Sequence, residues 1–262
     1  EREGVQITEE DVETVKSCDA CLKGHTLTPP GPGTFKSVAV TLRKALDLYA
    51  NVRPVKSRKG AKCLFDNVDM VIVRENTEGL YSGLEERTPE GAIAKRVITR
   101  RGSERIARFA FEYARAERRR KVTIVHKANI LKETCGLFRD VCFEVAKQYP
   151  EVEVEEQMVD AAAYRIACKP YELDVVVTTN LFGDILSDVA AAVTGGLGLA
   201  PGANIGDRYA MFEPVHGIAQ KYAGKAIANP SAAILSAAMM LKWLGEKAMA
   251  ERLEAALNKV IE

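Results

Sequence analysis

Apolar runs bounded by turn residues alternate along this chain with segments whose apolar residues recur every three or four positions. The runs predict buried strands, and the periodic segments predict helices. Strands are predicted at residues 20–22, 69–74, 121–126, 152–159 and 175–179. Helices are predicted after Thr8, at 37–48, 103–119, 131–149, 161–168, 230–244 and 246–261, and after Asn180. This alternation predicts an α/β fold with a largely parallel sheet.

The segments between these elements are predicted to be connections. Prolines and glycines at 28–34 are incompatible with regular structure, and residues 195–206 form a glycine-rich connection. Residues 79–100 are polar and rich in turn residues, so we expect an excursion from the main body that allows a strand at 93–98. The chain begins with Glu1 rather than Met, and its last ten residues still have a helical pattern. We therefore expect residues to be missing at both ends.

Composition narrows the class of protein. The 262 residues suffice for one large or two ordinary domains, and a net charge of +1 gives no overall attraction to nucleic acid or acidic membranes. We find no run of about 18 apolar residues and no signal-peptide pattern. Cys18 and Cys21 form a C-x-x-C pair without the second pair that a zinc site needs, so we expect reduced, structural thiols and a cytoplasmic location.

The predicted helix after residues 175–179 begins with a pair of carboxylates. Asp184 and Asp188 are four residues apart, so they share one face of the helix, where like charges repel. They also follow the carboxyl end of a strand, the usual ligand position in open α/β sheets. A Mg²⁺ or Mn²⁺ ion would suit their hard oxygen atoms. The alternative is two solvated aspartates that the helix dipole favours.

Three arginines are candidates for holding a substrate with more than one carboxylate. Arg43 lies on the predicted helix 37–48, Arg53 follows it, and Arg74 ends a predicted strand. The planar guanidinium group matches a carboxylate with two parallel hydrogen bonds. Surface or interdomain ion pairs are the alternative for each arginine.

Two further residues are candidates for acid–base chemistry. Lys127 follows the strand 121–126, where a dry environment can lower the pKa of a lysine and make it a base. Tyr81 can serve as the complementary acid. Either residue alone is more often a hydrogen-bonded structural group.

The segment 212–225 is a candidate for cofactor binding. Gly217 directly after His216 permits close approach by a ligand, and Lys221 with Tyr222 offers a cation and a hydroxyl to a phosphate. No G-x-G-x-x-G fingerprint opens a βαβ unit, so the sequence does not support a Rossmann site.

Several long motifs, in order, resemble those of the metal-dependent β-decarboxylating dehydrogenases, the family of isocitrate, homoisocitrate and 3-isopropylmalate dehydrogenases. The resemblance extends from about residue 5 to the end and is closest to isocitrate dehydrogenase. The motifs are RENTEGLY at 74–81, HKAN at 126–129, NLFGDILSD at 180–188, EPVHG at 213–217 and ANP at 228–230.

This resemblance implies an isocitrate/isopropylmalate dehydrogenase-like two-domain α/β fold that is not a Rossmann fold. A large cofactor-binding domain, incomplete here, would comprise residues 1–48 and 195–262. A small dimerisation and substrate domain would comprise 49–194, including the excursion at about 79–100. The resemblance also implies a homodimer whose sites are shared between subunits, with no nucleic-acid or membrane partner.

The resemblance further implies that NADP⁺ or NAD⁺ oxidises a small 2-hydroxy tricarboxylate, which then loses CO₂. Lys127 of the partner subunit would be the base and Tyr81 the acid. Asp184 and Asp188 would bind Mg²⁺ or Mn²⁺ together with the partner's Asp160, which also counts among the catalytic residues. The implied substrate-binding residues are Ser37, Arg43, Arg53, Arg74 and Asn129, and the implied cofactor-binding residues are His216, Gly217, Ala219, Lys221, Tyr222 and Asn229.

The choice of substrate depends on the start of the helix 37–48. Isocitrate enzymes resemble one another in a serine that Ser37 matches, whereas isopropylmalate enzymes have an acidic residue before that position, where this chain has Lys36. Isocitrate enzymes also have an asparagine where this chain has Ala39, which leaves room for a longer substrate. We therefore expect isocitrate first and homoisocitrate second, with 3-isopropylmalate disfavoured.

Lys221 and Tyr222 match the pattern of NADP-using isocitrate dehydrogenases, since NAD-using members have an aspartate and an aliphatic residue there. NADP is therefore expected before NAD. A catalytically silent regulatory subunit of the same fold is the non-enzyme alternative. Such a subunit should have lost at least one of five residues that this chain keeps: Tyr81, Lys127, Asp160, Asp184 and Asp188.

Overall fold

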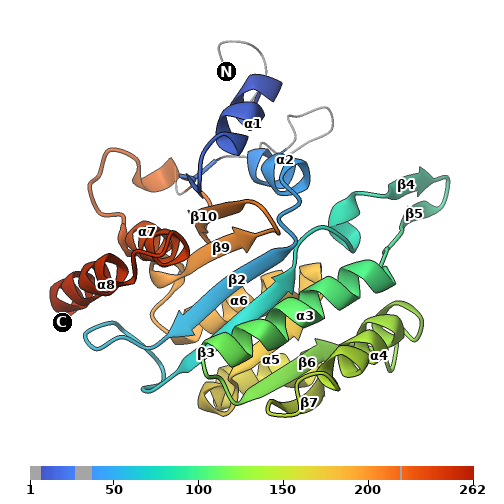
Figure 1. Cartoon of the computed structure of the whole chain (residues 1–262). Helices are drawn as coiled ribbons and strands as arrows, with labels where there is room; N and C mark the ends of the chain where they lie inside the picture. The colour runs from blue at the N-terminus through green and yellow to red at the C-terminus, as the bar shows by residue number, and fades with distance from the viewer. Residues whose placement is uncertain (1–6, 27–36, 219) are drawn as a thin grey trace.

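The computed structural model describes residues 7–26, 37–218 and 220–262, without the side chain of Lys221. Figure 1 shows a sheet with helices on both of its faces. The strands are β1 (Cys21–Leu22), β2 (Ala50–Lys56), β3 (Asp69–Glu75), β4 (Glu85–Thr88), β5 (Gly91–Ala94), β6 (Lys121–His126), β7 (Glu153–Met158), β8 (Val175–Thr178), β9 (Pro201–Ile205) and β10 (Ala210–Pro214). The helices are α1 (Glu9–Lys16), α2 (Val38–Ala45), α3 (Arg100–Ala116), α4 (Thr134–Ala146), α5 (Val159–Cys168), α6 (Asn180–Val193), α7 (Ser231–Trp243) and α8 (Lys247–Ile261).

The main sheet has eight strands in the order β1-β10-β9-β2-β3-β8-β6-β7. Its β3-β8-β6-β7 half is parallel, as the alternation of strands and helices predicts. In the other half, β2 pairs antiparallel with both β3 and β9, and β9 pairs antiparallel with β10. The α/β prediction is confirmed, but the sheet is mixed rather than largely parallel.

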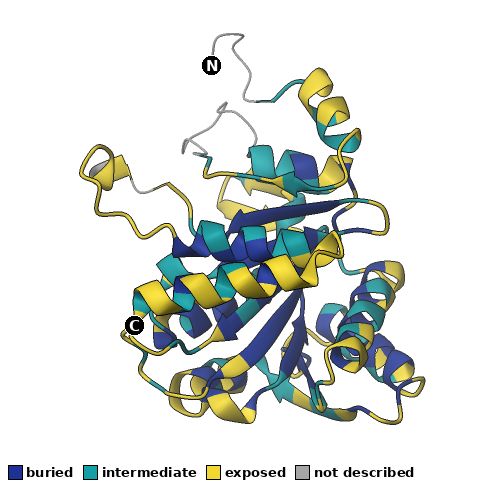
Figure 2. Cartoon of the chain, turned by 60° about the vertical axis from the view of Figure 1, so that its left-hand side comes forward, coloured by how far each residue is buried: buried dark blue, intermediate teal, exposed yellow. Residues whose placement is uncertain are grey.

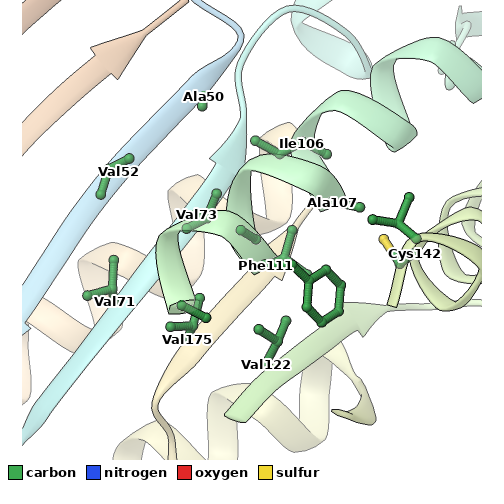
Figure 3. Packing of buried hydrophobic residues seen from close by; sticks show 14 of the residues in the cluster. Ala50, Val52, Val71, Val73, Ile106, Ala107, Phe111, Val122, Cys142 and Val175 are labelled. Carbon is green, nitrogen blue, oxygen red and sulfur yellow. The ribbon is translucent and has the colours of Figure 1, made fainter. Parts of the chain in front are cut away.

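The strand β3 explains why both faces of the sheet are covered. Its consecutive apolar residues point alternately to opposite faces. Val71 and Val73 pack in a cluster with Phe111 of α3, seen in Figure 3. Met70 and Ile72 pack in a second cluster, under α5 and α6. The central strands are accordingly buried, whereas the outer faces of the helices are exposed (Figure 2).

The expected helices are present, with ends that differ by a few residues from those predicted. Thr8 caps α1 in a capping box with Asp11, as its sequence indicates. Three strands of the main sheet were not predicted, β2, β9 and β10, and neither was β4 of the hairpin. The prediction of a connection over 195–206 is wrong for β9. The strand allowed at 93–98 is found only in part, because β5 ends at Ala94 and pairs with β4 in a hairpin. None of the described helices is long and apolar enough to cross a membrane.

The predicted domain boundaries fall within this single sheet, since β1, β9 and β10 belong to the predicted large domain and the other sheet strands to the small one. The predicted loop at 28–34 lies outside the described residues.

Candidate active site

A cavity of about 230 Å³ lies beside β10, β2 and β3 and the first turns of α2 and α6. Its lining includes eight of the residues predicted from the sequence to bind substrate, metal or cofactor or to act in catalysis: Ser37, Arg43, Arg53, Arg74, Tyr81, Asp184, His216 and Gly217. These residues come from six separate segments of the chain. The fold therefore assembles at one place what the sequence distributes over about 180 positions.

The pairing of β2 with β3 brings Arg53 and Arg74 to the same face of the sheet. Arg74 pairs with Asn51 in the antiparallel register, and Asn51 is two residues before Arg53. Side chains two residues apart on a strand share a face. Both arginines are buried, at 5% and 1% exposure, so each needs hydrogen-bond partners within the protein.

Arg53 obtains its partners from β2 itself and from α6. Its Nε donates to Asn51 Oδ1 at 2.7 Å, and its Nη1 donates to Ser187 Oγ at 2.5 Å. The same Nη1 lies 3.1 Å from Asp184 Oδ1 and 3.9 Å from Asp188 Oδ1. Burial, together with the charge of Arg74, lowers the pKa of Arg53 to about 10, which still leaves it charged near neutral pH. Arg53 thus places a positive charge next to both aspartates.

Asp184 is the anion at the centre of the site. It accepts hydrogen bonds from Arg74 Nη1 and from the hydroxyl of Tyr81. Burial opposes its ionisation, but the positive charges of Arg74 and Arg53 outweigh burial and lower its pKa. Burial and the bond to Asp184 raise the pKa of Tyr81, so its hydroxyl keeps a proton that it can donate. The guanidinium carbon of Arg74 also lies 4.9 Å from the centre of the Tyr81 ring.

Asp188 lies one turn further along α6 and is more exposed. Burial and the neighbouring charge of Asp184 raise its pKa, despite the opposing charge of Arg53. A divalent cation close to both carboxylates would remove this repulsion. The oxygen donors of Asp184 and Asp188 therefore fit Mg²⁺ or Mn²⁺, but as half of a site. Within the described residues there is no group of three His, Cys, Asp or Glu side chains that could hold a metal.

The predicted third carboxylate, Asp160, is not among the residues that line the cavity. Asp160 lies on α5 and accepts a hydrogen bond from Lys127 Nζ at 2.5 Å. This bond lowers the pKa of Asp160. Asn129, two residues after Lys127, is exposed. One chain thus has two separate groups of predicted site residues, the cavity and the Lys127–Asp160 pair.

Glu213 is a site residue to which the sequence assigned no role, although it begins the motif EPVHG. It is buried on β10, and its carboxylate oxygens lie 2.9 Å from Arg43 Nη2 and 2.8 Å from Lys23 Nζ. Burial opposes its ionisation, but the charges of Arg43 and Lys23 lower its pKa. Lys23, which follows β1, lines the cavity and was also missed. Asn204 adds a hydrogen bond of 3.0 Å to Glu213.

The start of α2 lies against the same cavity. Ser37 is the N-cap residue of α2, and its hydroxyl accepts a weak hydrogen bond of 3.5 Å from the Val40 amide. Ala39 and Val40 line the cavity beside Ser37. This end of the cavity therefore offers one hydroxyl and two small apolar side chains.

The predicted cofactor residues are only partly brought together. His216 and Gly217 line the cavity, and the ring of His216 lies 4.4 Å from that of His25. Asn229 lines a different cavity, next to α7 and α8, and accepts a hydrogen bond from the Ser231 amide. Tyr222 is 41% exposed. Ala219 and the side chain of Lys221 lie outside the described part of the structure.

Similarity to known proteins identifies the family. The model of the isocitrate/isopropylmalate dehydrogenase family matches residues 1–262. The chain belongs to this family. The resemblance stated from the motifs is confirmed, and so is the predicted fold class.

Relatives of the isocitrate/isopropylmalate dehydrogenase family with different names are about equally similar to this chain. A 3-isopropylmalate dehydrogenase of Methanothermobacter thermautotrophicus is 53% identical over 260 residues, which are 99% of this chain and 78% of that protein. An isocitrate/homoisocitrate dehydrogenase of Thermus thermophilus is 53% identical over 266 residues, covering 100% of this chain and 78% of that protein. Overall identity therefore does not select the substrate.

Solved structures of the family support the same fold. The crystal structure of an isocitrate dehydrogenase from Methylococcus capsulatus superposes with a TM-score of 0.96 at 51% identity, over 100% of this chain and 78% of the other. As a member of the isocitrate/isopropylmalate dehydrogenase family, the chain is a decarboxylating dehydrogenase of small hydroxy acids.

Proposed function

We propose that this dehydrogenase converts isocitrate to 2-oxoglutarate and CO₂, with NADP⁺ as hydride acceptor and Mg²⁺ or Mn²⁺ as metal. The charge of the cavity is the observation that carries the proposal. Its described lining includes four cationic side chains, Lys23, Arg43, Arg53 and Arg74, against two carboxylates, Asp184 and Glu213. Isocitrate has three carboxylates, whereas 3-isopropylmalate has two and an apolar branch. The surplus of positive charge favours the tricarboxylate.

Different side chains of the cavity bind different carboxylates of the substrate. Arg43, Arg53 and Arg74 pair with carboxylates of the substrate. Ser37 and Lys23 bind the carboxylate that is distal to the reacting hydroxyl group. These arginines, of which Arg53 and Arg74 are buried and Arg43 is partly buried, suit this role because their guanidinium groups are already fixed by hydrogen bonds, so little freedom is lost when substrate binds.

Proton transfers are assigned to Lys127 and Tyr81. Lys127 of a partner subunit would accept the hydroxyl proton of isocitrate, and a bound NADP⁺ would supply the hydride acceptor. The β-carboxylate then departs as CO₂, and Tyr81 donates its proton to the carbon that carried it. A divalent cation held by Asp184, Asp188 and the partner's Asp160 would polarise the hydroxyl and stabilise the negative charge left by decarboxylation.

A homodimer is part of this proposal because each chain has only part of the site. Lys127 and Asp160 form a pair outside the cavity, and Asp160 is 67% exposed at its side chain. A second subunit could bring that pair to the cavity of the first. The cofactor assignment to NADP depends on Lys221 and Tyr222, which offer a cation and a hydroxyl to a 2′-phosphate.

Two other substrates have specific support. Ala39, in place of an asparagine, leaves room at the start of α2 for homoisocitrate, and a homoisocitrate dehydrogenase of Methanocaldococcus jannaschii is 50% identical to this chain. Ala39 and Val40 also offer small apolar surfaces, and similar relatives are named 3-isopropylmalate dehydrogenase.

The test is a comparison of initial rates with isocitrate, homoisocitrate and 3-isopropylmalate, each with NADP⁺ and NAD⁺, in Mg²⁺ and in chelator. We expect the highest kcat/KM with isocitrate and NADP⁺. A preference for either other acid would overturn the substrate assignment. No turnover of any acid by protein that still binds Mn²⁺ would favour the regulatory subunit.

A pair of variants tests the charge argument. Lys23→Gln should lower kcat/KM for isocitrate at least tenfold more than for 3-isopropylmalate, because it removes a cation from the cavity. Lys44→Gln is the matched control, since Lys44 is an exposed residue of α2 that does not line the cavity. Equal losses for both acids in Lys23→Gln would show that Lys23 does not discriminate between them.

A further inference from the structure

Asn180, the first residue of α6, is buried between the cavity and the base of the 79–100 excursion. Only 2% of it is exposed, yet it is polar and takes no part in the mechanism proposed above. A buried amide needs partners for both its oxygen and its nitrogen. Both partners of Asn180 belong to segments that carry the chemistry.

The oxygen of Asn180 holds Arg74 from one side. Asn180 Oδ1 accepts from Arg74 Nε at 3.0 Å and from Arg74 Nη2 at 2.7 Å. The third nitrogen, Nη1, donates to Asp184. One amide oxygen and one carboxylate thus fix the plane of the guanidinium, and each terminal nitrogen keeps a second N–H for a ligand.

The same helical turn also fixes the aliphatic part of Arg74. A Cβ added to Gly183 would lie 2.7 Å from both Cβ and Cγ of Arg74. The side chain of Arg74 therefore runs directly over Gly183, which leaves the guanidinium little freedom except at its outer end.

The nitrogen of Asn180 faces the segment that carries Tyr81. Asn180 Nδ2 donates to the carbonyl oxygen of Glu78 at 3.1 Å. The side chain of Glu78 in turn accepts hydrogen bonds from the amide and hydroxyl of Thr99, at the other end of the excursion. The short helix Leu80–Ser82 follows, and Tyr81 is stacked by Arg74.

We propose that Asn180 is a positioning residue that fixes the position of Arg74 relative to Tyr81. The side chain of Asn180 thus aligns the guanidinium group that binds a substrate carboxylate with the tyrosine that donates the proton. The inference rests on the proposed role of Arg74 in substrate binding. Asn180 is not itself among the residues that line the cavity and, on this assignment, does not contact the substrate, so its effect passes through Arg74, which does line the cavity.

A double-mutant cycle tests the proposal with Asn180→Ala, Arg74→Lys and the double variant. Lysine has no Nε–Nη2 pair for Asn180 to orient, so the effect of Asn180→Ala should disappear when Arg74 is already lysine. We expect Asn180→Ala to raise the KM of the substrate about tenfold in the original background and less than twofold in the Arg74→Lys background.

Two further variants separate positioning from general loss of stability. Asn180→Asp keeps the acceptor for Arg74 but loses the donor to Glu78, so it should lower kcat while raising KM less than Asn180→Ala does. Thr194→Val removes the buried hydrogen bond from Thr194 Oγ1 to the Ala190 carbonyl at the other end of α6, and it should lower the melting temperature without changing KM.

The measurements are KM, kcat and thermal unfolding, with whichever of the three hydroxy acids the unmodified protein turns over best. A preference for an acid other than isocitrate would refute the substrate assignment and leave this test intact. Equal KM increases by Asn180→Ala in both backgrounds would overturn the positioning role. An increase of KM in Thr194→Val as large as in Asn180→Ala would overturn it too.

Discussion

The close contact between Gly183 and Arg74 makes Gly183→Ala an informative perturbation. The new methyl group would lie 2.7 Å from Cβ and Cγ of Arg74 and 3.2 Å from its Cδ. These are the inner atoms of a side chain that is 1% exposed, so they cannot move aside as the end of a flexible chain could. Arg74 must shift, or α6 must move away from β3.

Two effects of opposite sign determine the stability of this variant. Alanine in place of glycine within a helix stabilises the folded chain by up to about 1 kcal/mol. Overpacking of a buried site costs about 1–3 kcal/mol. We therefore expect a net loss of up to about 2 kcal/mol, with a fall in melting temperature of about 2–4 °C for each kcal/mol lost in a chain of this size.

The matched control is Gly136→Ala in α4. Gly136 is also a helical glycine, and a Cβ added there would meet no atom within 4 Å apart from the nearby backbone of its own helix. Gly136→Ala should raise the melting temperature slightly and leave KM unchanged, whereas Gly183→Ala should lower the melting temperature and raise the substrate KM about tenfold. The reasoning is refuted if both variants are stabilised and bind substrate equally well.

Three other changes have defined outcomes. Asp188→Asn should weaken Mn²⁺ binding at least tenfold, as measured by calorimetry. It should change the free energy of unfolding by less than about 0.5 kcal/mol, because the raised pKa of Asp188 indicates that its charge does not stabilise the fold. Retained affinity for Mn²⁺ would exclude Asp188 as a ligand. The lowered pKa of Glu213 means that its contribution to stability is complete above its ordinary pKa of 4.5 and is lost as the pH falls through its lower folded pKa. Glu213→Gln should therefore cost about 3 kcal/mol at pH 7 in chemical denaturation and less at low pH, and a difference independent of pH would contradict this. Lys221→Asp with Tyr222→Ile should shift the ratio of kcat/KM values from NADP toward NAD, and an unchanged ratio would show that other residues select the cofactor.

The parallel part of the fold could be predicted from the sequence because its strands are uninterrupted apolar runs, as in Met70–Val73. The strand β2 could not, since Asn51, Arg53 and Pro54 interrupt its pattern. Asn51 and Arg53 can be buried because they have hydrogen-bond partners on another strand and on α6, namely Asn204 of β9 and Ser187. Such pairing is a tertiary property that no pattern within a single strand reveals.

The candidate site was predictable as far as its motifs extend. Arg74, Tyr81 and Asp184 lie within long family motifs and line one cavity. The roles of Lys23 and Glu213 were missed because they follow from contacts between remote segments. Asn180 begins the motif NLFGDILSD, but its contact with Arg74 spans 106 residues of sequence and becomes visible only in the structure.

The antiparallel centre of the sheet also has a consequence for how the chain folds. Asn51 bonds to Asn204 across 153 residues, and Arg43 bonds to Glu213 across 170. Contacts of such separation form slowly, because the chain loses much of its entropy before they contribute any stability. We expect the cavity to be completed late, after β9 and β10 have joined β2. A ligand that bridges these segments should then slow unfolding more than it speeds folding.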